Sequence, residues 1–163
     1  MEKATELIVE KMAQTFEADG LPRTAGRLMG YLLMSRGERS LDELAEALQV
    51  SKASISTNAR MLERQGTLQR VTHPGDRRDY YTIADDLPAR VHYRALNRIR
   101  QSRDVLEVAL FTPSAADPVI RERLESYAAF LGDLMDMFAT VEARWRDQSS
   151  NEDPARWLAE ARG

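Results

Sequence analysis

The stretch that most constrains the fold runs from residue 40 to residue 83, where two helices precede two short strands. Ser40 and Glu43 form a capping box, in which each side chain satisfies a free backbone amide at a helix start. Apolar residues then recur at helical spacing as far as Leu48. Ser51 is a typical cap for a second helix, and Gly66 typically follows a helix end. The pattern predicts a helix, a tight turn at residues 49–50 and a second helix.

The second helix has an apolar face and a polar face. Ile55, Ala59 and Leu62 are spaced four and three apart, so we expect them to pack inward. Short hydroxyls and long cations lie on or near the other side, and the residues predicted to contact DNA there are Lys52, Ser54, Ser56, Thr57 and Arg60. Such a surface suits the major groove, where hydroxyls bond to base edges or phosphates and arginine pairs with guanine. Asn58 lies at the border and fits a half-buried position as well as a base-reading one.

After this helix the apolar period changes from 3.6 to about 2, which predicts a two-stranded β-wing. Leu68 and Val71 can face inward on the first strand, and residues 80–83 form the second. A Pro-Gly turn lies between the strands.

The tip of the predicted wing carries two adjacent arginines, Arg77 and Arg78. We expect them to reach the minor groove, whose negative potential attracts arginine, or the phosphates. Asp76 and Asp79 are expected to orient their guanidiniums through paired hydrogen bonds.

Helices are also predicted on both sides of this stretch. The first covers residues 2–18, with an apolar stripe of Leu7, Ile8, Met12 and Phe16, and the second covers residues 22–35. Gly26 and Gly30 lie four apart in the second helix, which favours tight packing against another element over a ligand role. After the wing, a helix is predicted over residues 88–111 and a connector over residues 114–118.

The C-terminal helix has the longest regular pattern in the chain. Apolar residues alternate at spacings of four and three from Ile120 to Trp145, which is typical of a helical seam. We expect this helix and the N-terminal helix to form a dimerisation bundle through Leu7, Phe16, Leu124, Leu131, Leu134, Phe138 and Val141. The predicted organisation is an N-terminal dimerisation helix (1–19), a winged helix-turn-helix domain (20–86), a C-terminal dimerisation region (87–147) and a tail or short terminal helix (148–163).

Net charge is −3 over 163 residues, but it is unevenly distributed. Residues 51–83 carry six basic and three acidic side chains, a local charge of +3, which leaves −6 for the rest. A basic head on an acidic body can bind phosphate locally while the body discourages loose association.

Other function classes find little support. No cysteine is present, which excludes disulfides, a cysteine-based zinc site and a thiol redox sensor within this chain. The only histidines, His73 and His92, have no metal-ligand spacing, and no nucleophile motif is present, so we expect no enzyme activity, no cofactor and no metal. No apolar run approaches the roughly 18 residues of a membrane span, and the acidic N-terminus is unlike a signal peptide. We therefore expect a cytoplasmic protein with no membrane partner.

Several of these motifs, in this order, resemble the winged helix of MarR-type transcriptional regulators. More narrowly, they resemble the GbsR-like branch, which includes repressors of glycine-betaine synthesis genes. The resemblance covers about residues 20–83. It is carried by Gly20-Leu21-Pro22-Arg23 with Gly26-Arg27 and Gly30, by Ser51-Lys52 with Ser54-Ile55-Ser56, by Leu62-Glu63 before Gly66, and by Gly75-Asp76-Arg77-Arg78-Asp79-Tyr80-Tyr81. It implies a mainly α fold with a small β-wing and a role in regulating transcription.

The sequence therefore predicts a sequence-specific double-stranded DNA-binding transcriptional regulator, a homodimeric repressor of a near-palindromic operator. Control by a small-molecule effector between bundle and heads is left open. The main alternative is a winged-helix module that binds protein and has no specific affinity for DNA. The aromatic residues of the C-terminal region could form a cage for a quaternary ammonium such as choline or betaine, although their spacing favours a seam: Tyr93, Phe111, Tyr127, Phe130, Phe138 and Trp145.

Overall fold

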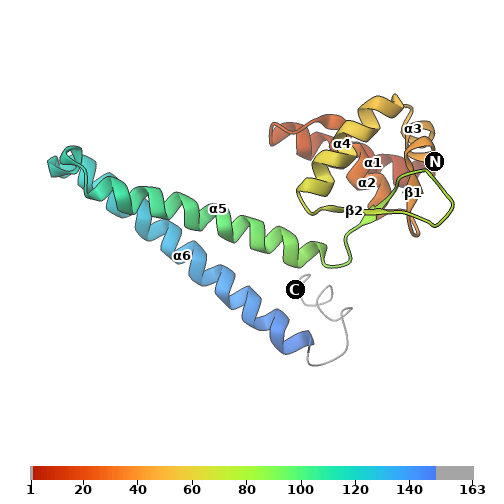
Figure 1. Ribbon diagram of the computed structural model, residues 1–163. Coiled ribbons are helices and arrows are strands. Elements are labelled where there is room, and N and C mark those ends of the chain that lie inside the picture. The colour runs from red at the N-terminus through yellow and green to blue at the C-terminus, as the bar shows by residue number, and fades with distance from the viewer. Residues whose placement is uncertain (1, 150–163) are drawn as a thin grey trace. The chain divides into compact units, whose positions relative to one another are not determined.

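The computed structural model describes residues 2–149, with the side chains of residues 146–149 left aside (Figure 1). Helices dominate, and the strands form one small sheet, which confirms the predicted mainly α fold with a β-wing. In chain order the elements are α1 (Lys3–Ala18), α2 (Arg23–Leu33), β1 (Arg39–Ser40), α3 (Leu41–Leu48), α4 (Lys52–Arg64), β2 (Leu68–Val71), β3 (Tyr80–Ile83), α5 (Leu87–Leu110), the short 3-10 helix η1 (Pro113–Ala116) and α6 (Pro118–Ser149).

Contacts divide the chain into two compact units, residues 1–91 and 92–163, with the boundary inside α5. The first unit holds α1 together with the winged helix, because α1 packs along α2. The N-terminal segment, residues 1–19, thus shares a unit with the domain predicted over residues 20–86. Residues 150–163 of the predicted tail lie outside the described residues.

Two glycines of α2 let its backbone approach that of α1. A β-carbon on Gly26 would lie 2.6 Å from the Cα of Ala13 and 2.6 Å from the carbonyl oxygen of Met12. A β-carbon on Gly30 would lie 3.0 Å from the Cα of Val9. These distances confirm the predicted tight packing and identify α1 as the neighbour.

The face of α1 that meets α2 overlaps the predicted stripe only in part, since the side chains of Met12 and Phe16 lie beside the α2 glycines whereas those of Leu7 and Ile8 do not. Val9 and Ala13 are fully buried, whereas Leu7 and Ile8 are 59% and 41% exposed. The prediction followed the large apolar side chains. Beside Met12 and Phe16, the glycines of α2 meet the backbone at Val9 and Ala13, where small and β-branched residues let the two helices come close.

One apolar core lies beneath α3 and α4. Leu44, Leu48, Ile55 and Leu62 are fully buried, as predicted, and each contributes about 1.5–3 kcal/mol relative to an exposed position. Tyr81 of β3 is the largest fully buried side chain. Its burial, with Glu63 and Asp79 nearby, raises the pKa of the phenol. The core thus fixes the helix-turn-helix against the sheet.

The predicted caps form in the structure. The backbone N–H and hydroxyl of Ser40 donate to Glu43 Oε2 at 2.7 and 2.6 Å, and the Glu43 N–H donates to the Ser40 hydroxyl at 3.3 Å. The Ser51 hydroxyl accepts from the Ser54 N–H at 3.3 Å and caps α4. Gly66 follows α4 with φ +69°, the left-handed conformation that favours glycine.

The predicted two-stranded wing forms from β2 and β3, and the sheet gains a third strand, β1, that was not predicted. The strand order is β1-β3-β2, and both pairs are antiparallel. The added strand, β1, has two residues, and its Ser40 also caps α3. A strand of two residues shows no alternation, so the sequence pattern could not reveal it.

In the second unit, α5 and α6 run antiparallel as a hairpin (Figure 1). Leu96 of α5 and Leu131 of α6 are 5% and 4% exposed. The His92 ring contacts the rings of Phe138 and Trp145, with centroids 4.8 and 5.0 Å apart. Part of the predicted α6 seam is therefore covered by α5 of the same chain.

Candidate nucleic-acid interface

The polar face of α4 is exposed while its opposite face is in the core. Lys52, Thr57 and Arg60 are exposed, and Ser54 and Ser56 are half-buried. The Thr57 hydroxyl donates to the carbonyl oxygen of Ala53 at 3.0 Å, which leaves its oxygen free to accept. All five residues predicted to contact DNA from this helix thus remain at least partly accessible to solvent.

Asn58 belongs to the core side of α4. It is 7% exposed, and its Nδ2 donates to the carbonyl oxygen of Ser54 at 2.8 Å. The base-reading interpretation of Asn58 is wrong, because its amide is buried and already hydrogen-bonded to the helix backbone.

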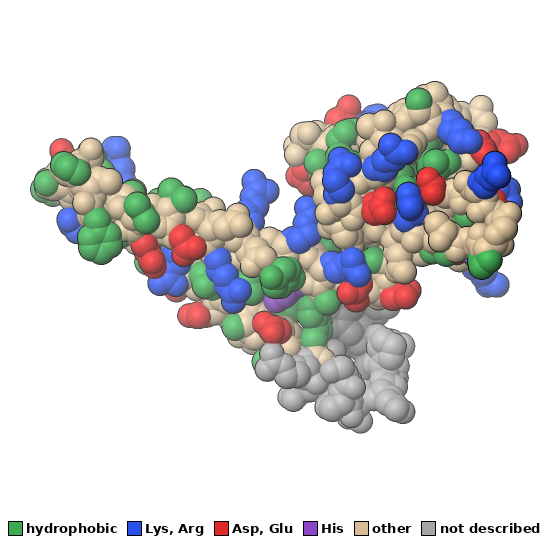
Figure 2. All heavy atoms as spheres, viewed as in Figure 1, with side chains coloured by type: hydrophobic (Ala, Val, Ile, Leu, Met, Phe, Trp, Pro, Cys, Tyr) green, Lys and Arg blue, Asp and Glu red, His purple; other side chains and the backbone are tan. Residues whose placement is uncertain are grey.

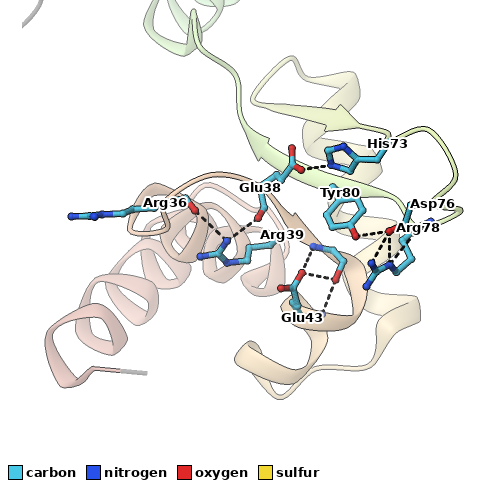
Figure 3. Close-up of polar contacts among 9 residues, drawn as sticks. Arg36, Glu38, Arg39, Glu43, His73, Asp76, Arg78 and Tyr80 are labelled. Atoms are coloured by element: carbon cyan, nitrogen blue, oxygen red, sulfur yellow. Dashed lines mark hydrogen bonds and ion pairs between the residues drawn. The ribbon is translucent and has the colours of Figure 1, made fainter.

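At the wing, Asp76 holds Arg78 in a fixed orientation (Figure 3). The Arg78 guanidinium donates to both carboxylate oxygens of Asp76, through Nε at 3.0 Å to each and through Nη2 at 2.6 Å. The Arg78 backbone N–H and the Tyr80 hydroxyl also donate to Asp76, at 2.9 and 2.8 Å. These donors hold the pKa of the Asp76 carboxyl well below its ordinary value. The predicted role of Asp76 is confirmed.

The predicted role of Asp79 is wrong. Its carboxylate pairs with Arg70 of β2, at 3.6 Å, instead of a wing arginine. Asp79 directly precedes β3, which pairs with β2, so its carboxylate reaches Arg70 across the strand pair and not the arginines at the tip.

The four candidate cations differ in whether an acid already holds them. Arg78 is paired with Asp76, and Lys52 of α4 is paired with Asp42 of α3. The Arg60 and Arg77 side chains are exposed and form no hydrogen bond or ion pair within the described chain. Figure 2 shows this mixture, with Lys and Arg side chains over the winged helix and Asp and Glu side chains between them.

The base of the wing is tied to the loop before β1. His73 Nε2 contacts Glu38 Oε1, and the His73 ring meets the Tyr80 ring edge-on, with centroids 4.9 Å apart (Figure 3). Sequence reasoning did not find this contact or the Asp42–Lys52 pair. The partners are 35 and 10 residues apart, so no local pattern relates them.

The residues predicted to mediate dimerisation have different environments within one chain. Leu131 is buried, and Leu124, Leu134, Phe138 and Phe16 are half-buried. Leu7 and Val141 are 59% and 37% exposed. Phe16 packs against the core of the first unit. The predicted aromatic cage is divided within the chain: Phe138 and Trp145 contact His92, whereas Tyr127 stacks on Phe130 with centroids 6.4 Å apart.

Two general searches of the described residues bear on other function classes. None of the helices within residues 2–149 has the length and apolar character needed to span a bilayer. The same part of the chain contains no group of three His, Cys, Asp or Glu side chains placed to hold a metal ion.

Comparison with known proteins places this geometry in a family. A MarR family profile matches residues 19–79. The HTH-type transcriptional regulator MmpR5 of Mycobacterium tuberculosis is 34% identical over 89% of this chain and 88% of its own length. The HTH-type transcriptional repressor GbsR of Bacillus subtilis is 34% identical over 53% of this chain and 47% of its own. A crystal structure of a transcriptional regulator superposes with a TM-score of 0.77 and 32% identity, over 88% of this chain and 99% of that one. The chain therefore belongs to the MarR family of winged helix-turn-helix transcriptional regulators.

Proposed function

We propose that this protein is a homodimeric repressor that binds a specific double-stranded DNA sequence. The observation that carries the proposal is that α4 and the wing, which both carry exposed cations, lie in the same compact unit. The exposed face of α4 offers Lys52, Thr57 and Arg60, and the wing offers an arginine already oriented by a bidentate carboxylate. Repression, rather than activation, is supported by the name of the similar repressor GbsR of Bacillus subtilis.

The two elements suit different parts of a DNA duplex. A capped helix with hydroxyls and cations on one face fits the major groove, where Arg60 would pair with guanine or phosphate. Arg77 and Arg78, at the end of a narrow β-turn, would enter the adjacent minor groove. Because Asp76 fixes the Arg78 guanidinium before binding, less conformational entropy is lost on association.

The second unit supports a dimer because it leaves apolar side chains uncovered. Val105 and Val108 of α5 are 68% and 70% exposed, and Phe111 is 91% exposed. Tyr127 and Phe130 of α6 are 51% and 54% exposed. A hairpin of two helices can cover only one face of each, so a second copy is the natural partner for the others. Two copies would present paired α4 helices to successive major grooves of a near-palindrome.

A small-molecule effector and a cytoplasmic location stay predictions from the sequence. The separate aromatic groups, His92 with Phe138 and Trp145, and Tyr127 with Phe130, are the places where a quaternary ammonium would first be sought. Choline and betaine are suitable first probes, and the expected readout is a change in DNA affinity on addition.

The DNA-binding proposal is tested with arginine variants and a duplex from upstream of the protein's own gene. Arg77→Ala/Arg78→Ala is expected to lose specific binding, because it removes both wing guanidiniums. Arg121→Ala is the control, since Arg121 is an exposed arginine on α6 that pairs with Glu125, away from the winged helix in the sequence. Equal specific binding by the wing variant and the control would contradict the proposed role of the wing, whereas no specific binding by the parent protein would favour the protein-binding alternative.

A further inference from the structure

Lys52 and Asp42 form an ion pair that joins the two helices of the helix-turn-helix. The Lys52 ammonium lies 2.8 Å from Asp42 Oδ1 and 3.0 Å from Oδ2, so it contacts both carboxylate oxygens. Both side chains are more than half exposed, at 58% and 59%. Lys52 is the first residue of α4, immediately after the Ser51 cap. The carboxylate is therefore in direct contact with a cation at the start of the helix assigned to the major groove.

The cap of α3 does not depend on Asp42, whose charge in the first turn adds only the modest favourable interaction of an acid with a helix N-terminus. The start of α3 is capped by Ser40 and Glu43, which satisfy each other's backbone amides without Asp42. An exposed pair of this kind contributes little to folding stability, because water solvates both groups and lysine loses side-chain entropy on pairing. The charge can be removed without disturbing the cap or the core.

The contrast with the wing indicates what the pair does. Asp76 receives hydrogen bonds from the Arg78 side chain, the Arg78 backbone and Tyr80, so it builds the turn and fixes a planar guanidinium. Among residues 2–149, the side chain that contacts the Asp42 carboxylate is that of Lys52, whose ammonium is a point charge on a flexible stem. Asp42 therefore competes for the cation without orienting it for another ligand.

We propose that Asp42 is an electrostatic brake on DNA binding: it occupies Lys52 in the free protein and repels the phosphate that Lys52 would bind. This inference rests on the proposed DNA-binding function. A DNA phosphate must displace Asp42 from Lys52, and the displaced carboxylate stays near the phosphate. The brake lowers affinity for all sequences equally, because phosphate contacts carry no sequence information.

Asp42→Asn is expected to tighten binding about twofold to fivefold at low salt, the range set by an exposed ion pair. It keeps the shape of the side chain and removes its charge. The tightening is expected to be equal on the upstream duplex and on a scrambled duplex. The slope of log affinity against log salt is expected to steepen by about one, because one more cation becomes free to displace counterions.

The matched control is Glu46→Gln. Glu46 is an exposed acid one turn further along α3, and its substitution removes the same charge from the same helix away from the pair. Lys52→Ala and the Lys52→Ala/Asp42→Asn double variant complete a thermodynamic cycle. Circular dichroism melting of every variant confirms that each is folded.

The experiment is a fluorescence anisotropy titration of each variant with both duplexes at two salt concentrations. The brake predicts tighter binding by Asp42→Asn, a smaller tightening in the Lys52→Ala background, where only the repulsion of the phosphate is relieved, and a smaller effect of Glu46→Gln. It is overturned if Asp42→Asn binds no more tightly than the parent, if it tightens binding equally without Lys52, or if Glu46→Gln has the same effect. Binding by the parent with no response to Asp42→Asn overturns the brake alone, whereas failure of every variant to bind either duplex overturns the DNA-binding proposal as well.

Discussion

Gly26→Ala tests the contact on which the position of α1 depends. The added methyl group would lie 2.6 Å from the Cα of Ala13, 2.6 Å from the carbonyl oxygen of Met12 and 2.9 Å from the Cβ of Phe16. Two of these neighbours are backbone atoms, which cannot rotate away. The substitution therefore has to separate α1 from α2.

The expected loss of stability follows from two opposing terms. Overpacking of a tight site costs about 1–3 kcal/mol, and we expect a cost near the upper end of this range because the clashing atoms belong to the backbone of α1. Alanine is favoured over glycine inside a helix by about 1 kcal/mol. The net destabilisation is then about 2 kcal/mol, and the melting temperature falls by roughly 4–8 °C for a chain of this size.

Two further glycines provide controls of known geometry. A β-carbon on Gly30 would lie 3.0 Å from the Cα of Val9, so the smaller clash and the helix preference nearly cancel in Gly30→Ala. Gly132 of α6 has no neighbour within 4 Å of such an atom, so Gly132→Ala is expected to stabilise its helix by about 1 kcal/mol. Thermal melting by circular dichroism gives the order, and hydrogen exchange locates the loss in α1 and α2. A Gly26→Ala protein as stable as the parent would refute the packing.

Three other perturbations have defined outcomes. Ser40→Ala is expected to cost about 1 kcal/mol by removing the cap of α3. The Ser40 hydroxyl and N–H lower the pKa of the Glu43 carboxyl below its ordinary value of 4.5, so the ionised carboxylate stabilises the fold above pH 4.5 and this stabilisation is lost as pH falls. The melting temperature of Ser40→Ala should therefore depend less on pH below 4.5 than that of the parent. Asp76→Asn is expected to weaken DNA binding roughly tenfold, on the order of one lost contact, while the matched Asp79→Asn does not; equal effects would refute the assigned orienting role. Light scattering should give about twice the 18.5 kDa chain mass, and Val108→Glu should halve it; a parent that is already monomeric would refute the dimer.

Local signals in the sequence predicted the elements of the winged helix well. The capping box at Ser40, the cap at Ser51 and Gly66 after α4 each act within a few residues, so their geometry is encoded where it occurs. The core face of α4 followed from its periodicity, because tertiary packing covers the apolar stripe that the pattern marks.

The missed features depend on residues distant in sequence. The glycines of α2 predicted a close approach, but only the structure identifies Val9 and Ala13 of α1 as the surface they meet. The acid that holds Lys52 is equally invisible to a local pattern, since it lies on the preceding helix. The heptad pattern of α6 predicts that one face of the helix is buried, but it does not identify whether α5 or a second chain packs against that face. Leu131 is buried within its own chain, which makes exposed Val108 a better probe of the dimer.

The central claim is that the α4 face and the wing bind a specific DNA sequence, and a single titration tests it most directly. The purified protein is titrated into the upstream duplex and into a scrambled duplex at about 50 and 200 mM salt. Four candidate cations per protomer predict a loss of at least roughly a hundredfold in affinity across this range, and specific recognition predicts a preference for the upstream duplex of roughly a thousandfold. Undetectable binding to both duplexes at the lower salt concentration would contradict the account.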